Sequence, residues 1–281
     1  MSDERSGELE EATRSAQVWR VEGGAREEIA DQLVREEPLE LRLRDVSVAV
    51  LMRTPGADEE LACGFAVTEG IVADPRDVRF AAHCRRAMPV YGRNVINLMV
   101  PDRLELDLER LRRNTFASSS CGVCGKATID AVFVRSAPPE LTVRVSLARV
   151  REAVAQMRAS QRVFEATGGL HAAGLVNLRT GRLLAVREDV GRHNAVDKVI
   201  GRQVLRRALP LRDHMLVVSG RIGFEIAQKA RVAGIPVMAA ISAPSSLAVD
   251  LARKSGMVMI GFVRSERLNV YAGEKFIDLD E

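Results

Sequence analysis

The sequence predicts an α/β fold in which a mostly parallel sheet carries helices on both faces, with a small β-rich subdomain in front of it. Two patterns lead to this prediction. In the C-terminal half, helical and extended apolar patterns alternate, as they do in α/β units joined by right-handed crossovers. In the N-terminal part, apolar residues instead recur at every second position over residues 39–52, which is typical of a hairpin with one buried face.

The 281 residues divide into four predicted segments. Residues 1–30 are polar, charged and interrupted by glycine, so we expect a flexible polar tail that buries little. Residues 31–115 form the small β-rich N-terminal subdomain, residues 116–145 the cysteine loop and its connection, and residues 146–281 the α/β domain. With 47% apolar residues, the chain can bury one large core or two modest ones.

The elements of the N-terminal subdomain are predicted from turns and short apolar runs. After the hairpin, Thr54-Pro55-Gly56 turns the chain. Asp58 then caps a helix that runs to about residue 72. Short strands are expected near residues 78–82 and 91–100, because apolar and β-branched residues gather there.

The α/β domain is predicted to begin with a long helix that Ser146 starts and Gly168-Gly169 ends. A pair of strands over residues 171–178 and 182–186 follows, joined by a turn at Thr180-Gly181. Regular alternation then continues to the end of the domain. Its predicted elements are helix 194–208, strand 215–219, helix 222–233, strand 235–241, helix 244–256 and strand 257–263.

Charge and composition exclude several classes of protein. The net formal charge is only +3, although residues 1–60 hold 8 basic and 16 acidic side chains and the remainder is basic. No apolar run is long enough to cross a bilayer, and the acidic N-terminus is unlike a signal peptide. Four cysteines are too few for a disulfide framework in a chain of this length. We therefore expect a cytoplasmic protein with neither nucleic acid nor a membrane among its partners.

Two thiols lie close together in the segment Cys121-Gly122-Val123-Cys124-Gly125-Lys126. Such a pair can bind a metal, cycle between dithiol and disulfide, or carry a labile sulfur on one thiolate. Backbone amides of a glycine-rich loop and the nearby Lys126 favour the thiolate, so Cys121 is the expected nucleophile. Attack by Cys124 on a persulfide at Cys121 would release sulfide and leave a disulfide.

The other two cysteines are weaker candidates for chemistry. Cys63 lies between small residues in a predicted helix, which is typical of a small buried residue. The pair His83-Cys84 would complete four zinc ligands with Cys121 and Cys124. Zinc sites normally offer two closely spaced ligand pairs, however, and adjacent residues do not easily bind one ion. We therefore expect no structural metal.

Polar clusters follow the predicted strands, at the level where open α/β sheets bind ligands. Small residues let a ligand approach the backbone there, and Arg, Ser and Asn donors suit phosphate and hydroxyl groups. These clusters predict a phosphorylated ligand. Structural interpretations stay open, because Ser219-Gly220-Arg221 could cap a helix, the run after Glu188 could be a solvated first turn, and His171 could have a core or surface role. The clusters span residues 187–194, 219–221, 242–246 and 261–267.

With these residues in view, the chain resembles the formate dehydrogenase accessory sulfurtransferase family, the FdhD proteins, from about residue 37 to residue 271. Many motifs carry the resemblance, and they follow one another in order. They are Glu37-Pro38-Leu39, Met52-Arg53-Thr54-Pro55-Gly56, Glu59-Glu60-Leu61, Thr68-Glu69-Gly70-Ile71, Ser120-Cys121-Gly122-Val123-Cys124-Gly125, Thr167-Gly168-Gly169-Leu170-His171-Ala172-Ala173, Glu188-Asp189-Val190-Gly191-Arg192-His193-Asn194-Ala195, Ser219-Gly220-Arg221, Ser242-Ala243-Pro244, Gly261-Phe262-Val263-Arg264 and Asn269-Val270-Tyr271.

The resemblance implies a sulfur carrier and sulfurtransferase. It would accept persulfide sulfur from a cysteine desulfurase and hand it to the molybdenum or tungsten bis-pterin guanine dinucleotide cofactor of formate dehydrogenase. It also implies a homodimer and a three-layer cytidine-deaminase-like sandwich with a mixed sheet. By motif, Cys121 would carry the persulfide beside Cys124. The expected cofactor-binding residues are Arg192, His193, Asn194, Ser219, Gly220, Arg221, Phe262, Val263, Arg264, Ser265, Glu266 and Arg267.

A zinc deaminase is excluded by the motifs themselves. Such enzymes need His-x-Glu in one helix and Pro-Cys-x-x-Cys in another. No histidine here has Glu two places on, and Ser120 precedes Cys121 where a deaminase has proline. Two alternatives from other classes stay open: a thiol-disulfide oxidoreductase that uses the cysteine pair, and a zinc-stabilised nucleotide-binding module.

Overall fold

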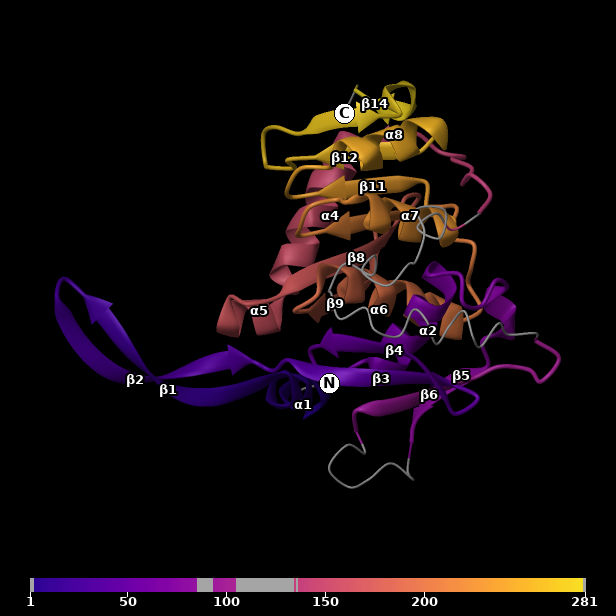
Figure 1. Cartoon of the computed structure of the whole chain (residues 1–281). Helices are drawn as coiled ribbons and strands as arrows, with labels where there is room; N and C mark the ends of the chain where they lie inside the picture. The colour runs from indigo at the N-terminus through magenta and orange to yellow at the C-terminus, as the bar shows by residue number, and fades with distance from the viewer. Residues whose placement is uncertain (1–2, 85–92, 105–133, 135, 280–281) are drawn as a thin grey trace.

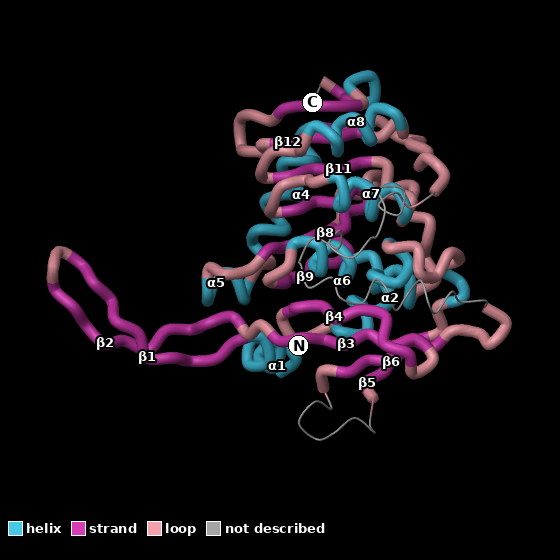
Figure 2. The backbone as a smooth tube through the Cα atoms, viewed as in Figure 1, coloured by secondary structure: helices cyan, strands magenta, loops and turns pink. Residues whose placement is uncertain are grey.

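The structure, a computed structural model, describes residues 3–84, 93–104, 134 and 136–279. It contains a six-stranded sheet with helices on both faces and a four-stranded sheet below it, and a helical layer lies between the two sheets (Figure 1). A long hairpin extends away from both (Figure 2). Among the described residues, we find no helix with the length and apolar character that spanning a bilayer requires.

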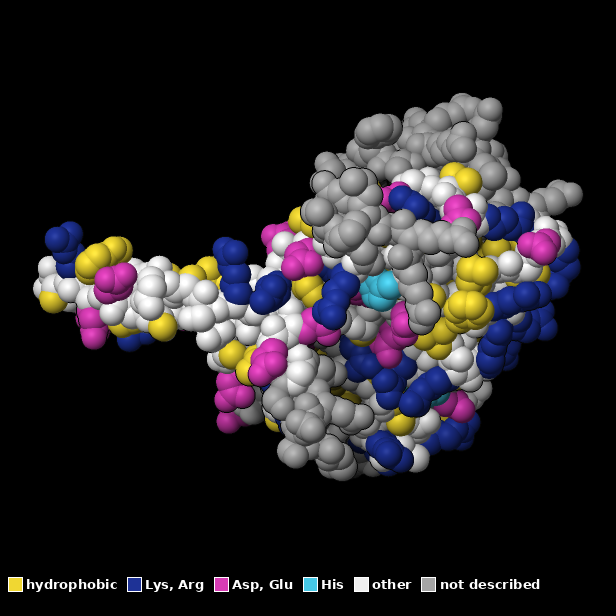
Figure 3. Space-filling model, turned by 90° about the horizontal axis from the view of Figure 1, so that it is seen from below, with side chains coloured by type: hydrophobic (Ala, Val, Ile, Leu, Met, Phe, Trp, Pro, Cys, Tyr) yellow, Lys and Arg dark blue, Asp and Glu magenta, His cyan; other side chains and the backbone are white. Residues whose placement is uncertain are grey.

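The N-terminal segment differs from the flexible tail that the sequence predicts for residues 1–30. Helix α1 (Asp3–Ala12) is followed by strands β1 (Thr13–Glu22) and β2 (Ala25–Val34), which pair in an antiparallel hairpin. Gly23 and Gly24 both have positive φ, as a two-residue turn between such strands requires. The hairpin nevertheless buries little: apolar, acidic and basic side chains all lie on its surface (Figure 3), and Trp19 is 61% exposed.

Four short strands form the smaller sheet, and two of them form the hairpin predicted over residues 39–52. Its order is β4-β3-β6-β5, with β3 antiparallel to β4, parallel to β6, and β5 antiparallel to β6. Leucines of β3 alternate toward the core, which is the pattern that marked this hairpin in the sequence. The strands are β3 (Glu37–Leu43), β4 (Val46–Arg53), β5 (Phe80–His83) and β6 (Val95–Met99), and the short 3-10 helix η1 (Pro75–Asp77) precedes β5.

Helix α2 (Asp58–Thr68) follows β4, but Asp58 does not cap it as predicted. The capping position is Ala57, which has a left-handed backbone and no side-chain cap. Asp58 is instead buried and accepts two hydrogen bonds from the Arg53 guanidinium, at 2.9 Å from Nε and 2.8 Å from Nη2. This bidentate pair ties the start of α2 to the end of β4.

The six-stranded sheet has the order β13-β12-β11-β10-β8-β9 and is mixed. Strands β10, β11 and β12 are parallel to one another, whereas β8, β9 and β13 add antiparallel pairings. The expectation of a mostly parallel sheet is therefore wrong. The hairpin of β8 and β9 pairs antiparallel with β10 on one side, and β13, which the sequence did not predict, pairs antiparallel with β12 on the other. The strands are β8 (His171–Asn177), β9 (Leu183–Asp189), β10 (His214–Val218), β11 (Val237–Ala240), β12 (Val258–Gly261) and β13 (Asn269–Ala272).

Helices cover both faces of this sheet, as predicted. One face packs on α4, and the other packs on α6, α7 and α8, so that two apolar cores are separated by the sheet. The long helix predicted from Ser146 breaks at Ser160 into α4 and α5, and Gly168 ends α5 in a left-handed conformation. The elements are β7 (Val145–Ser146), α4 (Leu147–Ala159), α5 (Arg162–Thr167), α6 (Arg192–Leu205), α7 (Phe224–Val232), α8 (Ser246–Lys254), η3 (Glu274–Phe276) and β14 (Ile277–Asp278), which pairs with β7.

Helices α2 and α6 join the two sheets through a very close crossing. A Cβ atom on Gly64 of α2 would lie 1.9 Å from the Asp197 backbone oxygen, and one on Gly201 of α6 would lie 1.7 Å from the Glu60 backbone oxygen. Both neighbours are backbone atoms, which cannot rotate away. The absence of side chains at these two positions therefore lets the subdomain pack directly on the α/β domain.

We expect Gly201→Ala to destabilise the protein by about 3 kcal/mol or more, because the added methyl group would force α2 and α6 apart. Urea denaturation measures the change in the free energy of unfolding. The matched control is Gly7→Ala in α1, where an added Cβ meets nothing within 4 Å. That control should be neutral or slightly stabilising. An unchanged stability for Gly201→Ala would contradict the close crossing.

Candidate functional site

One edge of the six-stranded sheet collects the polar clusters that the sequence singled out. Strand β9 ends there at Asp189, directly opposite His171 at the start of β8. Strand β10 ends there too, because Val218 is opposite Ala173. The segments that follow β11 and β12 leave at the same edge, since these strands are parallel to β10. The structure thus brings residues that are up to about ninety positions apart to one level of the fold.

At this edge lies a compact set of side chains that we call the strand-edge group: His171, Arg192, Ser219, Gly220 and Arg221. The Ser219 hydroxyl accepts a hydrogen bond of 2.8 Å from the Ala172 amide, which fixes the segment after β10 against β8. A Cβ on Gly220 would lie 3.3 Å from His171 Nδ1 and 3.8 Å from Arg192 Cδ. Gly220 therefore leaves the space in which the imidazole and the guanidinium stem approach each other.

His171 is neutral in this setting. Burial lowers its pKa below the ordinary 6.5, and the positive charges of Arg192, His193 and Arg221 lower it further, while Asp189 opposes them. Several cationic side chains thus surround a half-buried imidazole. An anion placed among them would relieve their mutual repulsion and would favour a protonated His171.

We expect binding of inorganic pyrophosphate to be coupled to proton uptake by His171. The pKa of His171 is below 6.5 in the free protein, and a bound anion raises it. The anion therefore binds more tightly as the pH falls from the raised pKa of the complex toward the lowered pKa of the free protein. The gain over His171→Gln should be at most about tenfold per pH unit between those two pKa values. Calorimetric titrations of both proteins measure it, and the ratio of their affinities removes the titration of pyrophosphate itself. Parallel pH profiles would show that His171 does not meet the anion.

His193 and Asn194, two predicted ligand residues, lie inside the protein rather than at its surface. His193 is 4% exposed and places Nε2 3.9 Å from the Glu225 Oε2 atom. The nearby His193 lowers the pKa of Glu225, which burial opposes. The sequence analysis missed Glu225, although an acidic residue in the first turn of a helix after a polar strand end is a recognisable signal.

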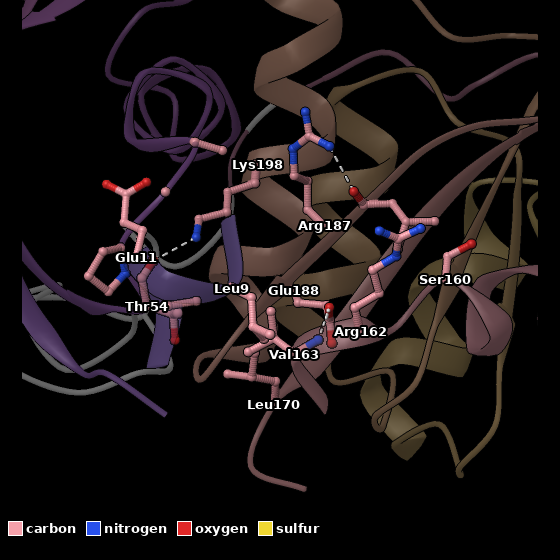
Figure 4. A pocket seen from close by; sticks show the side chains of 15 residues that line it. Leu9, Glu11, Thr54, Ser160, Arg162, Val163, Leu170, Arg187, Glu188 and Lys198 are labelled. Carbon is pink, nitrogen blue, oxygen red and sulfur yellow. Dashed lines mark hydrogen bonds between the residues drawn. The ribbon is translucent and has the colours of Figure 1, made fainter. Parts of the chain in front are cut away.

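Asn194 belongs to a buried network around Asp189. Its amide nitrogen donates to Asp189 Oδ1 at 2.9 Å and to the Met52 backbone oxygen at 2.8 Å. Lys198 is 2.7 Å from Asp189 Oδ2 and donates to the Thr54 backbone oxygen at 2.9 Å, which is drawn in Figure 4. The run after Glu188 is therefore not a solvated helix turn. The side chains of Asp189, Asn194 and Lys198 connect α6 to the end of β4.

The segment after β12 divides into exposed and buried positions. Phe262 has a left-handed backbone, with φ of 52°, and is 38% exposed. Such a conformation is strained for a side chain of this size. Val263 is buried in the core, so its side chain does not reach the surface. Arg264 Nη1 donates to the backbone oxygens of Ile241 and Val263. Ser265, Glu266 and Arg267 are exposed.

The helix-cap interpretation of Ser219-Gly220-Arg221 is also wrong. Helix α7 begins at Phe224 and its capping residue is Gly223, so the three residues form a loop between β10 and the helix. Arg221 is exposed on this loop. The segment is thus available for contact with a ligand, and a structural role in capping does not account for it.

A cavity of about 460 Å³ lies near the strand-edge group, between helix α1, the turn after β4, and α5 (Figure 4). Leu9, Val163 and Leu170 give it an apolar wall. Its charged residues are largely engaged: Glu188 accepts from the Val163 amide at 3.0 Å, and Lys198 belongs to the Asp189 network. The cavity therefore marks where the N-terminal helix docks.

The two thiols Cys121 and Cys124 lie outside the described residues. Of the others, Cys63 is buried as predicted, and burial, with the nearby Glu59 and Glu60 carboxylates, raises its pKa to about 12. Cys84 is half-buried, and neither Cys63 nor Cys84 forms a disulfide. Within the described ranges, no group of three or more His, Cys, Asp or Glu side chains has the arrangement of a metal site.

The FdhD/NarQ family model matches residues 34–278, which includes both sheets and the strand-edge group. The chain belongs to the FdhD/NarQ family. The family members it resembles include the sulfur carrier protein FdhD of Streptomyces coelicolor, which is 48% identical over 93% of this chain and 94% of its own. That of Streptomyces avermitilis is 47% identical over 95% and 96% of the two chains.

A solved structure of similar fold extends the comparison. It comes from Desulfotalea psychrophila and is assigned as a formate dehydrogenase accessory protein. The TM-score is 0.74 and the identity 25%, with 95% of this chain and all of the other covered. The family resemblance noted in the sequence is thus confirmed over nearly the whole chain.

Proposed function

We propose that this protein is a sulfur carrier that supports formate dehydrogenase. In this proposal, Cys121 accepts sulfur from a cysteine desulfurase and passes it to a molybdenum or tungsten bis-pterin guanine dinucleotide cofactor, which is the substrate. The names of the family members and the glycine-rich cysteine pair support the carrier role. The observation that carries the cofactor part is the strand-edge group, where cationic side chains surround the neutral His171.

Loading is a thiol exchange without net oxidation. The Cys121 thiolate attacks the outer sulfur of the desulfurase persulfide, a new S–S bond forms, and the desulfurase cysteine leaves as a thiolate. The product is a persulfide on Cys121, which is reversible. Cys63 is unsuited to this step because it is buried and its pKa is raised to about 12.

Release of the outer sulfur as sulfide requires two electrons. In our proposal, the Cys124 thiolate attacks the inner sulfur of the Cys121 persulfide, the outer sulfur leaves as sulfide, and a Cys121–Cys124 disulfide remains. A cellular dithiol reductant then restores both thiols. Without this second thiol, the persulfide has no reductant within the motif.

The cofactor would be held at the edge of the six-stranded sheet. Arg192, Arg221 and Arg264 would face its phosphates, because guanidinium groups pair with phosphate oxygens in a bidentate manner. Phe262 would offer an exposed aromatic face nearby. We also propose that the sheet and its helices have a cytidine-deaminase-like arrangement. Cysteine desulfurase, formate dehydrogenase and a second copy of the chain are the proposed protein partners.

The loading step is tested by mass spectrometry under non-reducing conditions. The full chain is incubated with a cysteine desulfurase and cysteine, and the peptide that contains Cys121 is weighed. An added sulfur atom on Cys121 supports the carrier. A lone Cys121–Cys124 disulfide without added sulfur supports a thiol-disulfide oxidoreductase instead, and stoichiometric zinc in the purified protein supports a zinc-stabilised module.

A further inference from the structure

Helix α7 holds the chain at a point ten residues after Cys124. The Val134 amide donates to Gln228 Oε1 at 2.8 Å. The Ser136 backbone oxygen accepts from Arg231 Nη2 at 2.6 Å. Gln228 and Arg231 are three residues apart, so they lie on one face of the helix. We call these two side chains the α7 clamp.

The site that receives Val134 is closely fitted. Gln228 is 5% exposed, so its carboxamide oxygen lies where an unpaired acceptor would cost free energy. Gly70, just beyond the end of α2, has a φ of 70°. An added Cβ on Gly70 would lie 3.1 Å from Val134 Cγ1, so the glycine leaves room for the valine side chain. Val134 is therefore seated between the end of α2 and α7.

Helix α7 is itself held against α2 and α6, which lie on the same side of the six-stranded sheet (Figure 1). Lys229, next to Gln228, is 3% exposed. Its ammonium group is 2.8 Å from Asp197 Oδ2 and 2.8 Å from Glu69 Oε1, and it donates to Thr68 Oγ1 at 2.9 Å. This buried lysine fixes α7 to both neighbouring helices, so the α7 clamp has a rigid support.

The α7 clamp lies near the strand-edge group. Helix α7 begins at Phe224, shortly after Arg221 in the loop that follows β10. Gln228 is four residues into the helix, which is a rise of about 6 Å along its axis. Ten residues of chain span at most about 36 Å. The attachment at Val134 therefore keeps Cys124 within about 36 Å of a point that is one helical turn from the proposed cofactor site.

We propose that Gln228 and Arg231 are positioning residues for sulfur transfer. They hold the chain that follows Cys124, so the thiol pair stays close to a cofactor bound at the strand-edge group. This inference rests on the proposed function and adds no chemical step to it. Cys124 attacks the Cys121 persulfide, sulfide leaves beside the cofactor, and a disulfide forms.

Loss of the α7 clamp would lengthen the free chain. The next buried residue after Ser136 is Pro139, which is fifteen residues after Cys124. The effective concentration of a tethered group falls with about the −3/2 power of tether length, so growth from ten to fifteen residues lowers it about twofold. Transfer to the cofactor should slow accordingly. Loading should keep its rate, because the desulfurase arrives as a separate protein.

The experiment loads the full chain with radiolabelled sulfur and varies the concentration of the bis-pterin guanine dinucleotide cofactor. The variants are Gln228→Leu, which removes the acceptor for the Val134 amide, and Arg231→Leu. Gln228→Glu keeps an acceptor oxygen at the same place and should restore the wild-type rate. The matched control is Arg253→Leu in α8, which removes a guanidinium hydrogen bond of 3.1 Å to the Tyr271 backbone oxygen.

We expect both leucine variants to load with sulfur as the wild-type protein does. Their maximal rate of transfer should be lower by at least about twofold, with an unchanged KM for the cofactor. Urea denaturation shows whether each variant is folded under the assay conditions. If Gln228→Leu does not fold, Arg231→Leu decides the outcome, because Arg231 is only half-buried.

The outcomes separate the clamp from the carrier function. Wild-type transfer by both leucine variants overturns the clamp, as does equal slowing in Arg253→Leu or no recovery in Gln228→Glu. A raised KM with an unchanged maximal rate also overturns it, because the two residues would then act in binding. If the wild-type protein gains no label on Cys121, the carrier function falls and the clamp with it. Loss of the clamp alone leaves the carrier function in place.

Discussion

Replacing Cys121 with alanine is expected to abolish maturation of formate dehydrogenase, with a loss of activity of about 100-fold or more. The carrier has to present a thiolate to the desulfurase persulfide, and the other cysteines cannot substitute. Cys63 is buried and its raised pKa keeps it protonated. Cys84 is half-buried and directly follows β5 of the smaller sheet, so it does not belong to the strand-edge group. Formate oxidation in cells that carry only the variant gives the readout.

The control for this prediction is Cys84→Ser, which should mature the enzyme at the wild-type level. Cys124→Ala should still be loaded with sulfur by the desulfurase, but should release it more slowly, since the second thiol supplies the electrons for release. Nucleotide binding by Cys121→Ala should equal that of the wild-type protein. Undiminished enzyme activity in Cys121→Ala would rule out the carrier mechanism.

Replacing Asp189 with alanine is expected to destabilise the protein by about 3–5 kcal/mol. Asp189 is fully buried and is the carboxylate that faces Lys198, at 2.7 Å from Nζ. Among the described residues, its removal leaves the buried Lys198 ammonium group with the Thr54 backbone oxygen alone, at 2.9 Å. It also removes the acceptor for the Gly191 amide, which is 2.8 Å away. Urea denaturation measures the loss.

Two further variants give this prediction its controls. Asp250→Ala, on the exposed surface of α8, should change the free energy of unfolding by less than about 0.5 kcal/mol. In the double variant Asp189→Leu with Lys198→Met, the uncompensated charge is absent, so much of the stability should return. If Asp189→Ala unfolds at the wild-type urea concentration, the network does not anchor β4 to α6.

The alternation of helices and strands over residues 194–263 could be read from the sequence because each element there has a buried face and its apolar period is unambiguous. The direction of the strands could not be read from the sequence. Whether β8 runs parallel or antiparallel to β10 depends on which strand it pairs with, and the register of Ala173 with Val218 is a tertiary property. The N-terminal hairpin was missed because its exposed strands lack the alternation of buried and polar positions, although Gly23-Gly24 is a turn signal.

The candidate site was predictable in part for the same reason. Glycine, serine and arginine after strand ends indicate the edge at which we propose that a ligand binds, and Ser219, Gly220 and Arg221 lie there. The direction of each side chain is decided by neighbours distant in sequence. Asn194 turns inward because Asp189 and the Met52 carbonyl accept from it. Gln161 makes no capping hydrogen bond with its side chain, and Glu188, from β9, takes the helix donors.

Transfer of radiolabelled sulfur tests the central claim most directly. The wild-type protein and Arg221→Ala, which removes an exposed side chain of the strand-edge group, are loaded with label at Cys121 and then mixed with the bis-pterin guanine dinucleotide cofactor. We predict equal loading of both proteins, with label passing to the cofactor from the wild-type protein and remaining on Arg221→Ala. Equal transfer from both proteins would contradict a cofactor site at this edge of the sheet.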